Sequence, residues 1–119
     1  MYTIINDPAH GWLTVPLGEI NELGIADKIS GHSYIDLNKG VAHLEEDCDA
    51  PRFMRAKGVD IGDRDAGIKW IQENTTEVYH DSVDHGCYPH PVRNCPEFTA
   101  FSFDYMIEFA MPIVAGPQS

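Results

Sequence analysis

The chain has 119 residues, of which 19 are Asp or Glu and 8 are Lys or Arg, so its formal net charge is −11. This charge argues against direct binding to nucleic acid, because such binding depends on Lys and Arg displacing condensed counterions. Apolar residues make up 43% of the sequence, a share that predicts one folded domain of ordinary size, spanning residues 1–119, rather than a disordered chain.

The sequence also bears on the cellular compartment. Its first 16 residues lack the basic and continuous apolar segments of a signal peptide, and no stretch approaches the roughly 18 apolar residues of a membrane span. Three cysteines, Cys48, Cys87 and Cys95, match no disulfide framework and indicate reduced thiols. We therefore expect a cytoplasmic protein that does not bind membranes.

The N-terminal half predicts short strands and one short helix. Residues 2–5 and 12–15 are strand-like pieces that end at turn-forming or proline residues. Apolar residues recur at helical spacing over 17–23, and Gly24 follows as a C-cap. Residues 33–37 and 41–45 flank Asn38-Lys39-Gly40, which predicts a β-hairpin.

The acidic run Leu44-Glu45-Glu46-Asp47-Cys48-Asp49 lies where this hairpin meets the next predicted helix. Asp49 is the expected N-cap of that helix, and Gly58 lies just past its expected end. Cys48 is expected to pack in the core as a small residue. A second helix is expected to begin at Asp65, and residues 77–80 are expected to form a strand. The run is therefore a junction between a strand and a helix.

The C-terminal third has weaker patterns. Residues 81–96 carry three prolines and no periodicity, so we expect a long loop rich in His and Cys. Residues 97–113 fit helical spacing better than strand alternation, and residues 114–119 are expected to be a frayed tail. Together these elements predict an α+β fold with a small antiparallel sheet and two or three short helices on one face.

The acidic residues are the first candidates for function. Charge on a folded surface can serve solubility alone, or it can bind a basic partner through steered, salt-sensitive association. In its sharpest form the second interpretation is a nucleic-acid mimic that occupies a groove lined by Lys and Arg. The candidate partner-binding residues are Glu45, Glu46, Asp47 and Asp49, with Asp60, Asp63 and Asp65 as a second group.

The loop offers an alternative, a small zinc-binding module. Its potential ligands are of the types that zinc prefers, namely His80, His85, Cys87, His90 and Cys95. Their spacing contains no paired motif such as CxxC or HxxxH, which disfavours the alternative. We therefore predict no cofactor.

A catalytic function has less support. Asp7 and His10 are of the right types for an acid/base pair, but no nucleophile motif surrounds them. Negative charge on both sides of Cys48 raises the pKa expected for its thiol and disfavours the reactive thiolate. No full set of catalytic roles can be assigned, so we predict that the protein is not an enzyme.

Residues 6–53 carry a pattern composed of DPAHGWLTVP, LGIADKIS, HSYIDL and HLEEDCDAPRF. The pattern resembles small uncharacterised proteins encoded by phages and other mobile elements. Small acidic proteins from such elements are similar to anti-defence factors, including anti-CRISPR and anti-restriction proteins. This resemblance implies an inhibitor of a host defence complex, acting on a basic surface in the host cytoplasm.

Overall fold

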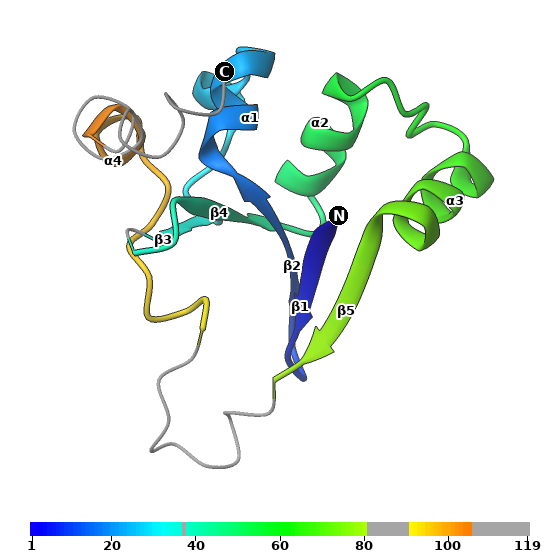
Figure 1. Cartoon of the computed structure of the whole chain (residues 1–119), viewed down its shortest axis with the longest axis horizontal. Helices are drawn as coiled ribbons and strands as arrows, with labels where there is room; N and C mark the ends of the chain where they lie inside the picture. The colour runs from blue at the N-terminus through cyan, green and yellow to red at the C-terminus, as the bar shows by residue number, and fades with distance from the viewer. Residues whose placement is uncertain (37, 81–90, 106–119) are drawn as a thin grey trace.

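The computed structural model describes residues 1–36, 38–80 and 91–105. In these ranges a twisted five-stranded sheet carries helices on one side (Figure 1), which confirms the α+β class. No helix in the described ranges is both long enough and apolar enough to cross a membrane.

Neighbouring strands of the sheet are antiparallel, with one exception. Their order across the sheet is β3-β4-β2-β1-β5, and only the pair of β1 and β5 among them is parallel. The antiparallel sheet expected around the hairpin is present, and β5 adds one parallel strand at its edge, because the intervening helices return the chain to run alongside β1 in the same direction. The strands are Tyr2–Asn6 (β1), Gly11–Pro16 (β2), Tyr34–Asp36 (β3), Val41–Glu45 (β4) and Thr75–Tyr79 (β5).

The helices begin close to the predicted positions. They are Leu17–Leu23 (α1), the 3₁₀ turn Ala26–Lys28, Asp49–Ala56 (α2), Arg64–Asn74 (α3) and Ala100–Tyr105 (α4). Gly24 ends α1 with a φ of 68°, the left-handed conformation that glycine adopts without a steric penalty. Helix α3 begins one residue before the expected Asp65, and α4 occupies part of the expected helix 97–113, whose residues 106–113 lie outside the described ranges.

The two faces of the sheet differ in chemistry. Alternate residues of the strands point to one face, where they form the hydrophobic core with the helices. The strand residues of this core are Leu13, Val15, Ile35, Ala42 and Leu44, and the helices and the C-terminal segment add Leu17, Ile20, Ala50, Phe53, Phe98 and Phe103.

The opposite face bears Trp12, Thr14 and His43, among other residues, according to the strand register. The segment 91–98 covers part of this face and pairs with β3, since Ile35 donates a backbone hydrogen bond to Pro96 and Phe98 donates one to Ser33. Residues 91–96 of the expected loop therefore hold a defined position, while the expected loop residues 81–90 and the expected tail 114–119 lie outside the described ranges.

Candidate partner-binding site

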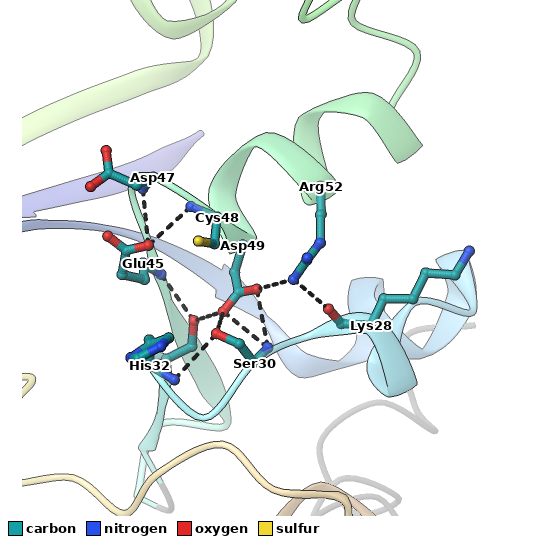
Figure 2. A network of polar contacts seen from close by, with 9 residues as sticks. Lys28, Ser30, His32, Glu45, Asp47, Cys48, Asp49 and Arg52 are labelled. Atoms are coloured by element: carbon teal, nitrogen blue, oxygen red, sulfur yellow. Dashed lines mark hydrogen bonds and ion pairs between the residues drawn. The ribbon is translucent and has the colours of Figure 1, made fainter.

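The acidic run has an internal structural role at Asp49. This side chain is fully buried, and its carboxylate accepts hydrogen bonds from the Ser30 backbone N–H and from the hydroxyls of Ser30 and Ser33 (Figure 2). Arg52 lies 2.9 Å from the carboxylate and completes the set. Asp49 is the first residue of α2 and caps nothing with its side chain, so the predicted N-cap was wrong, and the residue is removed from any partner surface.

Glu45 and Cys48 also differ from expectation. The Glu45 carboxylate accepts the backbone N–H groups of Asp47 and Cys48 at 3.0 and 2.9 Å (Figure 2), which fixes the turn between β4 and α2. Cys48 is exposed rather than packed in the core, because at this junction the side chain that points into the interior is that of Asp49. Desolvation and the nearby carboxylates of Glu45 and Asp49 raise the pKa of the Cys48 thiol, in the predicted direction.

The second acidic group shapes the entry to α3. Asp63 is the N-cap, because its carboxylate accepts the backbone N–H groups of Asp65 and Ala66 at 3.0 and 3.3 Å. Asp65, where the sequence predicted the start of this helix, is its second residue. Asp60 accepts the backbone N–H of Gly62 at 3.1 Å, and all three carboxylates are exposed.

A groove of about 480 Å³ is lined by one carboxylate from each acidic group, Glu46 and Asp63. Helices α2 and α3 lie on the same side of the sheet, α2 next to β4 and α3 next to β5 (Figure 1). Between them the groove is lined by apolar side chains that include Ile4, Leu13, Met54, Ile61, Ile68, Trp70 and Ile71. No residue of α3 is fully buried, and Ile68 is 42% exposed, so apolar surface of this helix remains accessible to a ligand.

Charged residues at the groove are mostly acidic. Glu46 from the junction, Asp63 from the α3 cap and Glu77 from β5 all line it, and Arg64 is the one cation among its described lining residues. Glu46 and Asp63 were predicted as site residues, whereas Glu77 was missed. The alternation of β5 predicts that Glu77 lies on the helix side of the sheet, but its position beside β1 depends on the parallel pairing.

Other predicted residues lie elsewhere. Glu45 and Asp47 line a second depression of about 370 Å³, on the side of the sheet that carries Trp12, together with residues of both charge signs that include His10, His32, Arg93 and Glu97. Asp60 and Asp65 line neither the groove nor this depression. Of the seven predicted carboxylates, Glu46 and Asp63 therefore form the candidate site.

Asp7 fixes the turn of the N-terminal hairpin. Its carboxylate accepts the backbone N–H groups of Ala9 and His10 and lies 2.9 Å from Arg93. Burial raises the pKa of Asp7, but the hydrogen bonds from Arg93 and the turn outweigh it and hold the pKa well below its usual range. Arg93 in turn lies 5.1 Å from the centre of the Trp12 ring, within cation–π range.

The predicted zinc ligands of the loop are only partly within the described ranges. His85, Cys87 and His90 lie outside them, whereas His80 follows β5 and Cys95 lies in the segment beside β3. Cys95 is close to two residues that the sequence did not single out, Asp36 and His43.

Comparison with known proteins finds no matching family model, no matching curated protein and no matching solved structure.

Proposed function

We propose that the protein binds a basic segment of a partner protein in the groove between α2 and α3. The observation that carries this proposal is the joint lining of the groove by apolar side chains and by the carboxylates of Glu46, Asp63 and Glu77. Its volume suits several side chains rather than a whole domain. The ligand that matches it is a short segment with apolar side chains next to Lys or Arg.

The negative charge of the protein also favours a basic ligand. The net charge of −11 attracts a cationic partner over a distance comparable to the Debye length, and complementary charge at the groove selects the segment that docks. The resemblance of residues 6–53 to proteins of mobile elements makes the partner class a host defence complex whose basic surface normally holds nucleic acid. Binding there would inhibit the complex without catalysis.

The apolar floor of the groove distinguishes this proposal from simple mimicry of nucleic acid. A polyanion mimic needs only charge, and its affinity would be insensitive to apolar contacts. Here the side chains of Ile61, Ile68 and Ile71 have apolar surface that is partly open to water. Burying such surface against a ligand contributes about 25 cal/mol per Å² to the binding free energy. We therefore expect affinity to depend on both components.

The first test replaces Glu46 and Asp63 by Lys. Glu46 is exposed and its side chain caps no turn, in contrast to Glu45, so reversal there leaves the junction intact. Asp63→Lys also removes the α3 cap, so Asp63→Asn in combination with Glu46→Lys serves as a milder variant that retains a capping side chain. The matched control for Glu46→Lys with Asp63→Lys is Glu22→Lys with Asp27→Lys, which makes the same change in net charge at exposed positions away from the groove.

The probe is a synthetic peptide of Leu and Lys, compared with oligolysine of equal charge in titrations monitored by calorimetry. We expect the Leu/Lys peptide to bind more tightly, and the groove variant to lose on the order of tenfold in affinity, or about 1.4 kcal/mol. The control should lose much less. Equal losses in both variants, or equal affinity for both peptides, would show that diffuse charge rather than the groove binds the ligand.

A further inference from the structure

A second site lies on the opposite face of the sheet, where three side chains of metal-binding types converge. Asp36 ends β3, His43 lies in β4, and Cys95 lies in the segment 91–98, which pairs with β3. One ligand atom from each, a carboxylate oxygen, an imidazole nitrogen and the thiol sulfur, lies within 4.8 Å of the others. His43 is 3% exposed and the other two are half-buried.

Backbone pairing fixes this convergence. Tyr34 pairs with His43 and Asp36 pairs with Val41, so Asp36 and His43 are diagonal neighbours on one face of the hairpin. The backbone bond from Ile35 to Pro96, at 2.8 Å, places Cys95 beside β3. Asp36 and His43 are thus held by the sheet, and Cys95 is held by the segment 91–98, which is hydrogen-bonded to β3.

Two of the three side chains are also oriented by neighbouring groups. The hydroxyl of Thr14 lies 2.7 Å from Nδ1 of His43; with the Nδ1 proton in this bond, the neutral ring carries its lone pair on Nε2. Oδ1 of Asp36 accepts the backbone N–H groups of Asn38 and Lys39 at 2.9 and 3.1 Å. Partners of this kind commonly orient the ligands of protein metal sites.

We propose that Asp36, His43 and Cys95 bind a zinc ion, with water in the fourth position. Thiolate, imidazole and carboxylate are the ligands that zinc takes, and three protein ligands leave a tetrahedral site open to one further molecule. On binding, the Cys95 thiol, which donates to the Pro91 carbonyl at 3.3 Å, releases its proton to solvent and the sulfur lone pair bonds the metal. The ion would join segment 91–98 to the hairpin.

This site is different from the loop module that the sequence offered as an alternative, although the two share Cys95. A zinc ion bound by His80, His85, Cys87, His90 and Cys95 would not need Asp36 or His43. Substitutions outside Cys95 therefore separate the two possibilities.

The experiment adds Co²⁺ and Zn²⁺ to the full chain and follows two signals. Co²⁺ gives a thiolate charge-transfer band if a cysteine binds it, and Zn²⁺ affinity is measured by competition with a chromophoric chelator. We expect one ion per chain, loss of the band in Cys95→Ser, and at least a tenfold loss of zinc affinity in Asp36→Asn and His43→Gln. Thr14→Val should weaken zinc binding by about tenfold through the ring orientation.

The controls are Cys48→Ser, which removes an exposed thiol away from the site, and the triple variant His85→Gln, Cys87→Ser, His90→Gln. Both should keep the cobalt band and wild-type zinc affinity. Loss of binding in the triple variant, or wild-type affinity in Asp36→Asn, would overturn the proposal, as would the absence of zinc binding by the folded wild-type chain. Circular dichroism identifies any variant that fails to fold, and Asp36→Asn covers the case in which the buried His43 cannot be replaced.

Discussion

At the scale of single residues, Asp49 shows how a side chain that looks like part of an acidic surface can belong to the interior. Its neighbours Glu46 and Asp47 are exposed, while Asp49 is buried and accepts bonds from Ser30, Ser33 and Arg52. A buried carboxylate is tolerated only where such donors compensate for the lost water. The network therefore joins the start of α2 to the segment before β3.

We predict that Asp49→Ala destabilises the protein by about 3 kcal/mol, because it leaves the Ser30 and Ser33 donors without their acceptor and removes the ion pair of Arg52. Asp47→Ala, two positions earlier on the surface, should change stability by no more than about 0.5 kcal/mol. Urea unfolding of both variants, followed by tryptophan fluorescence, measures the difference. Similar midpoints for the two variants would contradict the assigned role of Asp49.

At the scale of elements, the end of α1 depends on Gly24, the residue that follows the helix. Gly24 has a φ of 68°, and its N–H bonds the carbonyls of Asn21 and Ile20. A Cβ atom there would meet no neighbouring atom within 4 Å, so any penalty of substitution comes from the backbone conformation alone.

Gly24→Ala should therefore cost about 1–2 kcal/mol, the penalty of a left-handed conformation for a residue with a Cβ atom. Gly31 is the matched control, since it also has open space where a Cβ atom would lie but no positive φ. Gly31→Ala should be neutral or stabilise by about 0.4–1 kcal/mol through the unfolded chain. Thermal unfolding of the pair checks this, and equal effects would exclude the backbone explanation.

Local sequence patterns were sufficient to predict most of these helices and strands, but they were insufficient to predict the two candidate sites. Proline, glycine and apolar spacing at 16–24 and 38–40 predict α1 and the hairpin because the interactions involved are close in sequence. The direction of Asp49, by contrast, depends on Ser30 and Ser33, and the groove depends on the parallel pairing of β1 with β5. Asp36, His43 and Cys95 form no spacing motif, because the register of β3 and β4 brings the first two together and the pairing of segment 91–98 with β3 adds the third.

At the scale of the whole molecule, the ion pair between Asp7 and Arg93 connects the first hairpin with the segment that crosses the opposite face of the sheet. The two residues are 86 positions apart. The pKa of Asp7 in the folded state lies below its usual range, and thus below the value of about 3.9 in an unfolded chain. Folding is consequently favoured by the ionised carboxylate.

The stabilising contribution of Asp7 should be complete above about pH 4 and should decline as the pH falls toward the folded-state pKa. Asp7→Asn keeps an oxygen for the turn but loses the charge. Its urea midpoint should be below that of the wild type near neutral pH and should approach it as the pH falls to about 2, well below the unfolded carboxyl pKa. Arg93→Gln should converge in the same way, whereas a difference that is constant with pH would contradict this account.

The order in which the strands are synthesised leaves both edges of the sheet open for a time on the ribosome. Residues up to Glu45 contain the four antiparallel strands, but one edge of that partial sheet awaits β5 and the other awaits the segment at Pro96–Phe98. At the usual translation rates the interval lasts on the order of seconds. During that time a nascent chain displays two unsatisfied strand edges, which are templates for pairing with other chains. The later residues 75–98 therefore protect the first 45 residues from association during translation.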